Sequence, residues 1–270
     1  MADTAKRKAV IFVGAHPDDI ELGCAGTIGV FLARGYDVRC IFVTKGGYTG
    51  SPFEREKESR AALTGLGVKN ENIVFGDFPD TRIPATVDTI KFLQDSYLTN
   101  WKGRDRAALD VYAAFVHTSH DVHQDHRAVA ECCITAFRRV PRIYAYEAPS
   151  SIGAFNPTAF VDISQHLQAK QEALACHKSQ LALGNRYYLE YDSMINLSRF
   201  RGRQGGFEHA EAFEVWKESI DPPELKQRGG ASRGGASRGG AASGGAAGGR
   251  SSPGGASRGR SSRARSSRGR

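Results

Sequence analysis

Short apolar runs alternate along most of the chain with longer segments in which apolar residues recur at helical spacing. The short runs, bounded by polar or glycine-rich segments, predict buried strands, and the segments between them predict amphipathic helices. We expect strands at 10–13, 38–43, 73–75, 111–116, 142–146 and 160–162, and helices at 22–33, 54–66, 87–97, from His126 to just before Pro141, and at 164–181.

This alternation of strands and helices predicts an α/β fold, with a Rossmann-like, mostly parallel sheet flanked by helices. Such a sheet binds its ligands in the crevice at the carboxyl ends of the strands, where the strand order reverses. In the common strand order this crevice lies between the first and the fourth strand. The expected strands at 10–13 and 111–116 should therefore flank the functional site.

The last part of the chain has a different composition. From Lys226 to Arg270 it is almost entirely Gly, Ala, Ser and Arg, with a repeated GGASR phrase and no Val, Leu, Ile or aromatic residue. Such a segment cannot bury enough apolar surface to offset the entropy lost on ordering. We therefore divide the chain into one folded domain, 1–222, and a disordered basic tail, 223–270.

The net charge of +8 comes from this tail. The segment 226–270 carries 11 of the 37 basic residues and no acidic residue, which leaves 26 basic against 29 acidic residues in the rest. A slightly acidic domain gives no reason to expect nucleic acid on its own surface. The tail can make weak, non-specific contacts with phosphates, but it has no aromatic residue to stack on bases.

The remaining composition favours a cytoplasmic protein. The apolar stretch before Gly14 is too short for a signal-peptide core or a membrane span. The five cysteines lack CxxC spacing and mostly lie among apolar residues, so we expect buried free thiols and no disulfide framework. A homo-oligomer is compatible with this sequence.

Two polar clusters follow directly after apolar runs. Residues 15–19 read AHPDD after the run at 10–13, and residues 117–126 read HTSHDVHQDH after the run at 111–116. The two clusters are about a hundred residues apart in sequence, yet both lie where expected strands flank the crevice. Since both contain histidine and aspartate, we interpret them as one metal site.

A catalytic zinc ion usually has three nitrogen or oxygen ligands from the protein and a fourth position open to water. One histidine and one carboxylate of the first cluster, with one histidine of the second, supply that set. His16 and Asp19 stand three apart around a turn, so both can reach one point, and Asp18 is left beside the metal-bound water as a candidate general base. Fe²⁺ or Mn²⁺ would suit the same ligands.

The second cluster offers further roles. With His126 as a ligand, His123 lies one turn back, on the substrate side, where it could stabilise an oxyanion or protonate a leaving amine. Asp125 could orient a histidine through its second ring nitrogen. We expect His117 and His120 to be surface or internally satisfied histidines. For Asp121 we expect a role in shaping the loop.

These residues resemble a known family. The segment 16–23, HPDDIELG, followed by Gly26 and Thr27, and the later segment 123–127, HQDHR, are similar to the PIG-L or LmbE-like deacetylases. The resemblance extends over about residues 9–217, with further landmarks in family order at 55–58, Asp77, 146–151, 155–157, 161–164, Lys170, 177–180 and 210–213.

The resemblance implies a metal-dependent enzyme that removes acetyl groups from N-acetylglucosaminyl compounds, with a small-molecule conjugate as substrate. The roles it implies are these: His16, Asp19 and His126 as metal ligands, Asp18 as general base, His123 as oxyanion stabiliser or acid, and Arg55 as a contact to the part of the substrate beyond the glucosamine. An alternative for Arg55 is a helix-surface arginine paired with Glu56 or Glu58. The chain departs from the family in its tail, and in Asp121, where some members have tyrosine.

Two other functions compete with this interpretation. Gly23, Gly26 and Gly29 in a Rossmann-like fold could indicate a dinucleotide-binding oxidoreductase, but their spacing is GxxGxxG, and the carboxylates of Asp18 and Asp19 would repel a pyrophosphate. Close packing of the helix explains these glycines better. The second alternative is a metal-binding interaction protein that its Arg/Gly tail tethers to nucleic acid.

Overall fold

The computed structural model describes residues 8–98 and 110–220, so the predicted disordered tail lies outside the described residues. The strands are β1 (Lys8–Gly14), β2 (Asp37–Phe42), β3 (Ile73–Phe75), β4 (Asp110–His117), β5 (Arg142–Tyr146), β6 (Ala159–Asp162) and β7 (Ala210–Glu218). The helices are α1 (Asp19–Ala33), α2 (Pro52–Gly65), α3 (Val87–Leu98), α4 (Gln124–Ala136), α5 (Leu167–Leu174), α6 (Lys178–Leu181) and α7 (Tyr191–Gly205).

The strands form one sheet in the order β3-β2-β1-β4-β5-β7-β6. The strands from β3 to β5 are parallel to one another, whereas β7 runs antiparallel to both β5 and β6. This arrangement confirms the predicted Rossmann-like, mostly parallel sheet. The strand order reverses between β1 and β4, which is the predicted position of the crevice.

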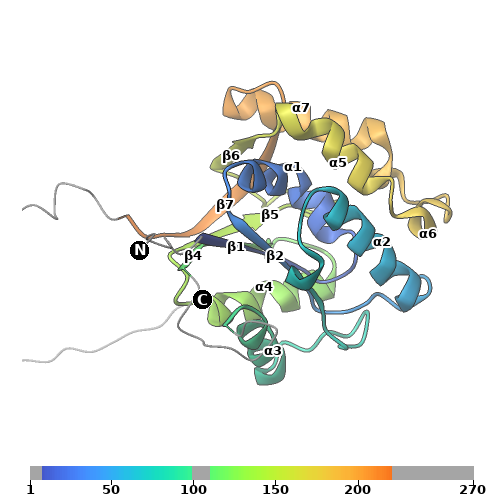
Figure 1. The fold of residues 1–270 in the computed structure, drawn as a ribbon, viewed down its shortest axis with the longest axis vertical. Coiled ribbons are helices and arrows are strands. Elements are labelled where there is room, and N and C mark those ends of the chain that lie inside the picture. Colours follow the sequence, from blue (N-terminus) through green and yellow to red (C-terminus); the bar gives the residue numbers. More distant parts are fainter. Residues whose placement is uncertain (1–7, 99–109, 221–270) are drawn as a thin grey trace, which may run out of the picture. The chain divides into compact units, whose positions relative to one another are not determined.

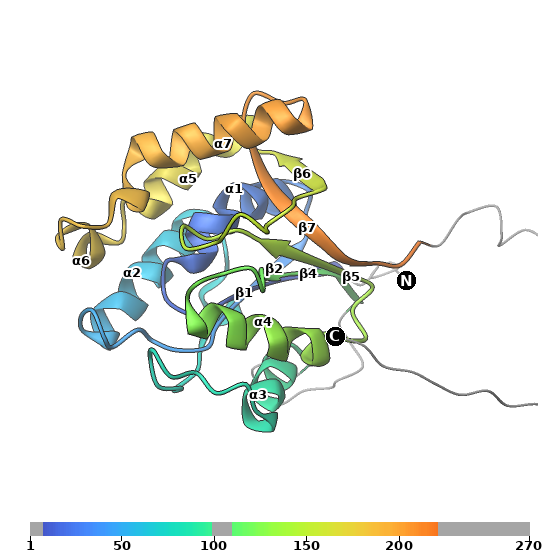
Figure 2. The same cartoon turned by 180° about the vertical axis from the view of Figure 1, so that it is seen from behind.

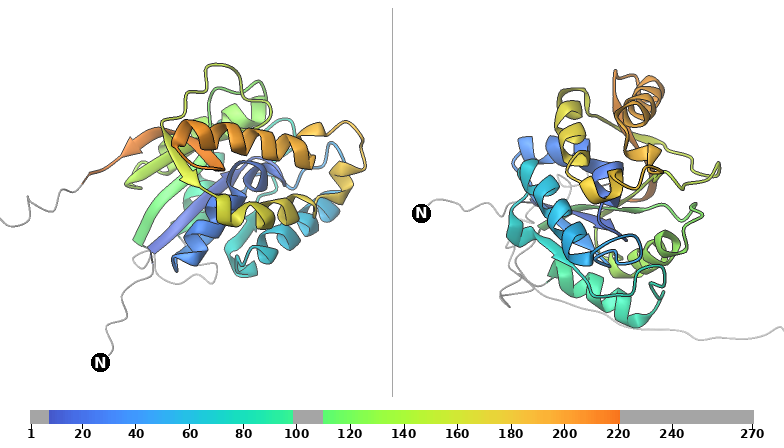
Figure 3. Two further views of the ribbon diagram at one scale, coloured as in Figure 1. Left: turned by 90° about the horizontal axis from the view of Figure 1, so that it is seen from above. Right: turned by 90° about the vertical axis from the view of Figure 1, so that its right-hand side faces the viewer.

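Helices cover both faces of the sheet, as Figure 1 and the reverse view in Figure 2 show. Helices α3 and α4 lie against one face, and α1 and α2 lie against the other, where α5 packs beside α1 and α7 packs on β6 and β7 (Figure 3). The side chains of β1 alternate between these layers: Ile11 and Val13 belong to the apolar cluster with α3 and α4, and Val10 and Phe12 to the cluster with α1 and α2. Among the described residues, no helix has the length and apolar character needed to span a bilayer.

The predicted helix at 164–181 is interrupted. The structure has a 3-10 turn (Ser164–His166), then α5, and a separate short α6. The break follows Leu174, where the chain turns to place His177 fully inside the protein, with its Nε2 atom 3.3 Å from Oε1 of Glu21. The apolar spacing continues through this segment, so periodicity alone does not reveal the break.

The pattern predicts no element between 182 and 220, yet the structure places α7 and β7 there. Helix α7 has mostly polar and charged residues, so its apolar residues are too few to give a clear helical pattern in the sequence. Strand β7 lies between β5 and β6 and is antiparallel to both. The pattern of successive βαβ units predicts only parallel strands, so it does not predict a strand at this position.

The glycines of α1 have a packing role. A Cβ atom at Gly26 would lie 2.6 Å from Ile163, and one at Gly29 would lie 2.6 Å from His166. At Gly23 a Cβ atom would overlap the ring of Tyr146. These glycines let α1 approach its neighbours closely, in agreement with the packing interpretation of the sequence.

Candidate active site

The two polar clusters meet at the carboxyl ends of β1 and β4, which are neighbours in the sheet. The first cluster forms the turn from β1 into α1, whose first residue is Asp19. The second cluster runs from the end of β4 to α4, whose N-cap residue is His123. The fold therefore brings together side chains that are about a hundred residues apart in the sequence.

Two of the three predicted metal ligands, His16 and His126, contact the third, Asp19. Nδ1 of His16 lies 3.5 Å from Oδ2 of Asp19, and Nε2 of His126 lies 3.3 Å from Oδ1 of the same carboxylate. All three residues are buried. Two imidazole nitrogens thus face a shared carboxylate.

Further carboxylates contact the opposite ring nitrogens. Nε2 of His16 lies 3.0 Å from Oδ2 of Asp125 and 3.2 Å from Oδ1 of Asp80, and Nδ1 of His126 lies 3.0 Å from Oδ2 of Asp121. Histidines that bind a metal are commonly oriented in this way, since a carboxylate at the second nitrogen fixes the ring and its tautomer.

The electrostatics of these groups favour a cation. Burial opposes the charged form of His126, but Asp19 and Asp121 outweigh it and raise its pKa to about 9. For His16 burial is likewise outweighed, by Asp125, Asp19 and Asp80, and its pKa lies well above the usual value. Carboxylates in this number create a negative potential that suits a bound metal ion as well as a proton.

Other groups of side chains overlap with this set. Ligand atoms of His16, His123 and His126 lie within 4.8 Å of one another, as do those of Asp19, His117 and His126, and those of His16, Asp80 and Asp125. His16 and His126 each occur in two of these groups. The predicted set of His16, Asp19 and His126 is not itself one of these groups, but each of its members occurs in at least one of them.

Asp18 stands between two of the predicted ligands and has an unusual backbone. Its φ angle of 107° lies in the region that favours glycine, so the turn into α1 holds a strained conformation. The side chain is buried, and burial is the main reason that its pKa rises to about 6, although Arg55 opposes the shift. The residue lines the same pocket as the metal-ligand candidates, which is the candidate catalytic pocket.

Arg55 contacts the carboxylate of Asp18 and the turn that carries it. Its guanidinium donates to the carbonyl oxygen of Pro17 at 2.6 Å and to Oδ2 of Asp18 at 3.3 Å. Only 4 % of Arg55 is exposed, so the alternative of a helix-surface arginine is wrong, and Glu56 pairs with Arg60 at 2.9 Å instead. A side chain at Gly46 (φ 67°) would overlap the guanidinium, so this glycine makes room for Arg55.

His123 is oriented by the start of α4. Its Nδ1 atom accepts a hydrogen bond from the backbone N–H of Asp125 at 3.2 Å. The proton of the neutral ring therefore resides on Nε2. Burial, together with the nearby His126 and His16, lowers the pKa of His123, and the side chain lines the pocket.

The two remaining histidines of the cluster lie outside the pocket lining. His117 is fully buried beneath Asp19, and its Nε2 atom accepts the backbone N–H of Ala15 at 3.1 Å. Burial is the main cause that lowers the pKa of His117 to about 4, so the ring is neutral at pH 7. The side chain of His120 is 44 % exposed and contacts Glu214.

The candidate catalytic pocket has a volume of about 280 Å³, and several of its residues were not anticipated from the sequence. They include Asp80 from the loop after β3, Tyr48 and Thr49 from the loop after β2, and Arg186 and Tyr188 from the segment before α7. The position of each loop at the carboxyl end of a strand is the signal that could have identified Asp80 and Tyr48. Asp121 and Asp80, which contact the candidate ligands, are likewise missing from the predicted site.

The sequence is similar to a protein family and to known proteins. The profile of the family PIG-L, GlcNAc-PI de-N-acetylase, matches residues 11–137. A protein of Escherichia coli K12 named uncharacterized deacetylase YaiS is 34% identical over 184 residues, which cover 66% of this chain and 95% of that protein. The diacetylchitobiose deacetylase of Thermococcus kodakarensis is 27% identical over 228 residues, which cover 76% of this chain and 81% of that protein.

A solved structure of similar fold is the conserved protein TT1542 from Thermus thermophilus. It has a TM-score of 0.66 and 25% sequence identity, and the match covers 79% of this chain and 97% of that one.

Proposed function

Because the chain belongs to the PIG-L family of de-N-acetylases, we propose that it is a metal-dependent deacetylase that hydrolyses the acetamide of an N-acetylglucosaminyl compound. The observation that carries this proposal is the convergence of His16, Asp19 and His126 beside the buried Asp18, in one pocket of about 280 Å³. The name of the Thermococcus relative, a diacetylchitobiose deacetylase, supports a substrate that contains N-acetylglucosamine.

The donor set fits a divalent cation. His16, Asp19 and His126 would hold it with two nitrogens and one oxygen, a set that suits Zn²⁺ and also Fe²⁺ or another divalent metal. Asp125 and Asp121 would keep the two imidazoles oriented. When bound, the cation would polarise the acetyl carbonyl group and lower the pKa of a water molecule.

Asp18 would act as the general base. Its carboxylate takes a proton from the water whose oxygen attacks the acetyl carbon, and it later returns that proton to the glucosamine nitrogen as the C–N bond breaks. Burial favours this use, because a carboxyl group with a pKa raised to about 6 can both accept and release a proton near neutral pH. Arg55 positions the carboxylate through the contact at 3.3 Å.

His123 would donate a hydrogen bond to the acetyl oxygen as negative charge develops there. The hydrogen bond from Asp125 N–H to Nδ1 leaves the ring proton on Nε2, which suits this role. The other role considered for His123, an acid that protonates the leaving amine, requires a charged ring, and burial disfavours that state. Arg55 is also our candidate for a contact to the substrate beyond the glucosamine.

The alternatives receive less support. The glycines of α1 are accounted for by packing against Tyr146, Ile163 and His166, so they provide no argument for a dinucleotide. A metal-binding interaction protein would need no buried carboxylate like that of Asp18 beside its metal.

An amine-release assay tests the proposal. The protein is loaded with Zn²⁺ or Fe²⁺ and offered a panel of N-acetylglucosaminides, with His126→Ala and His120→Ala as paired variants. We expect amine release by the wild type and by His120→Ala, since His120 does not line the pocket. His126→Ala should lose metal and activity together, while its fold is largely kept. Full metal occupancy in His126→Ala, or no amine from any member of the panel with the metal-loaded wild type, would contradict the proposal.

A further inference from the structure

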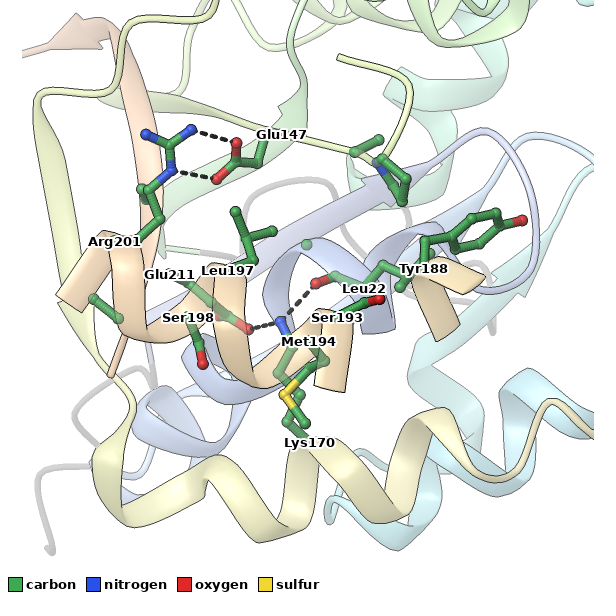
Figure 4. A pocket seen from close by; sticks show the side chains of 15 residues that line it. Leu22, Glu147, Lys170, Tyr188, Ser193, Met194, Leu197, Ser198, Arg201 and Glu211 are labelled. Atoms are coloured by element: carbon green, nitrogen blue, oxygen red, sulfur yellow. Dashed lines mark hydrogen bonds and ion pairs between the residues drawn. The ribbon is translucent and has the colours of Figure 1, made fainter. Parts of the chain in front are cut away.

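A second cavity, of about 290 Å³, adjoins the catalytic pocket. It lies among α1, α5, α7 and β7, and Leu22, Pro149 and Tyr188 line both spaces. Figure 4 shows Tyr188 at one end of the cavity and the pair of Arg201 and Glu147 at the other. The catalytic pocket and this cavity therefore meet at these three residues.

The charged groups of the cavity are already engaged within the protein. Nζ of Lys170 donates to Oε1 of Glu211 and to the carbonyl oxygen of Leu22, each at 2.6 Å, as the dashed lines in Figure 4 mark. The same carboxylate of Glu211 also accepts two backbone N–H groups of α1. Arg201 binds Glu147 through two hydrogen bonds, at 2.7 and 2.6 Å. Among the described lining residues, a ligand therefore finds no unpaired charge.

The rest of the lining is largely apolar. Leu22, Met194 and Leu197 supply aliphatic surface, with small residues from the segment after β5 and from β7 beside them. Leu197 is 44% exposed although its helix packs on the domain. An apolar cavity with an exposed leucine in its wall suits an apolar ligand, because filling it removes apolar surface from water without desolvating a free charge.

We propose that this cavity receives an apolar aglycone, an alkyl or aryl group joined to the glucosamine whose acetamide occupies the catalytic pocket. This inference rests on the proposed function, which it extends to the class of substrate. A cavity of about 150 Å³ is sufficient to bind benzene, so the volume of about 290 Å³ accommodates a ring or a chain of moderate length.

The test uses substrates that differ only in the aglycone, methyl and n-hexyl N-acetyl-β-D-glucosaminide. Each methylene group buried in the cavity should lower KM by a factor of about three to four, which corresponds to ~0.8 kcal/mol. We expect KM to be at least about tenfold lower for the hexyl compound and kcat to be similar, since the chain is bound equally in the ground state and the transition state. Equal KM values for the two substrates would overturn the proposal.

Paired variants locate the effect. Leu197→Gln places an amide in the wall of the cavity, and Leu183→Gln makes the same change at a leucine that is 46% exposed and lines neither space. Ser193→Trp adds an indole at a lining position. The preference for the hexyl substrate should fall in Leu197→Gln and Ser193→Trp and persist in Leu183→Gln. A preference that survives in both cavity variants would place the apolar site elsewhere.

A binding measurement separates this inference from the proposed function. The probe is n-hexyl β-D-glucoside, which has no acetamide to hydrolyse, and binding to the metal-free protein is measured by calorimetry. Binding by the wild type and its loss in Leu197→Gln support the cavity even if no deacetylation occurs, in which case only the proposed function fails. An active deacetylase that does not bind the probe would refute the cavity and leave the proposed function intact.

Discussion

Asp19 is the residue at which the two halves of the site meet. Its carboxylate lies 3.5 Å from His16, 3.3 Å from His126 and 3.0 Å from His117. Only the first two rings have their other nitrogen held by a further carboxylate, whereas His117 is stacked beneath His126 in the core. His16 and His126 are therefore candidate ligands and His117 is a core residue, although all three contact Asp19. The difference lies in the partner of the second ring nitrogen.

The neighbouring carboxylates of Asp18 and Asp19 should respond differently to the same substitution. Asp18→Asn should retain the metal, because His16, Asp19 and His126 remain, but turnover should fall on the order of 10² to 10⁴, which is the usual contribution of a general base. Asp19→Asn should weaken metal affinity, since a neutral amide is a poorer ligand than a carboxylate. Metal stoichiometry and turnover are measured together on both variants.

The two measurements also decide the reverse assignment. If Asp18→Asn is free of metal while Asp19→Asn stays loaded and inactive, the roles of the two aspartates must be exchanged. Glu54→Gln is a suitable control, since Glu54 is an exposed carboxylate at the start of α2 and lines no part of the catalytic pocket. It should leave both the metal content and the turnover unchanged.

At the scale of elements, hydrophobic periodicity predicts β1 to β6 and α1 to α4 well, but it misses α7 and β7 and predicts the boundaries at the site poorly. Helix α1 begins at Asp19 and α4 at Gln124, earlier than the apolar pattern indicates, because the polar residues of the site occupy the first turns. The contacts of Asp80 and Asp121 with His16 and His126 depend on how loops fold over the strand ends. Sequence spacing within an element does not determine those loop conformations.

The packing of α1 gives a prediction for stability. Gly26→Ala should lower the free energy of unfolding by about 1–3 kcal/mol, because the new methyl group would lie 2.6 Å from Ile163, which is fully buried and has little room to move. Gly65→Ala, at the end of α2, is the matched control: nothing lies within 4 Å of its Cβ position, so stability should stay the same or rise slightly. Urea unfolding of both variants measures the difference, and equal stabilities would contradict the packing role of Gly26.

At the scale of the whole domain, one carboxylate joins parts that are far apart in the chain. Glu211 of β7 accepts hydrogen bonds from the backbone of Gly26 and Thr27 in α1 and from the ammonium group of Lys170 in α5. The elements that periodicity did not predict thus complete the packing of α1, the helix that begins with Asp19. Strand β7, which periodicity did not predict, thus anchors the helix whose first residue is the candidate ligand Asp19.

The basic tail should be dispensable for the chemistry. Every residue that lines the catalytic pocket lies between His16 and Tyr188, whereas 226–270 contains only small residues, arginines and a few other polar residues. A chain that ends at Pro223 should therefore keep its kcat and KM for the best N-acetylglucosaminide of the panel. Removing 11 basic residues should at the same time abolish any binding to RNA that the full chain shows at low salt, since such binding depends on phosphate contacts and weakens steeply with salt concentration. Steady-state kinetics and salt-dependent RNA binding are measured on both chains, with thermal unfolding as a control for the fold. A large loss of turnover at unchanged thermal stability would show that the tail takes part in catalysis.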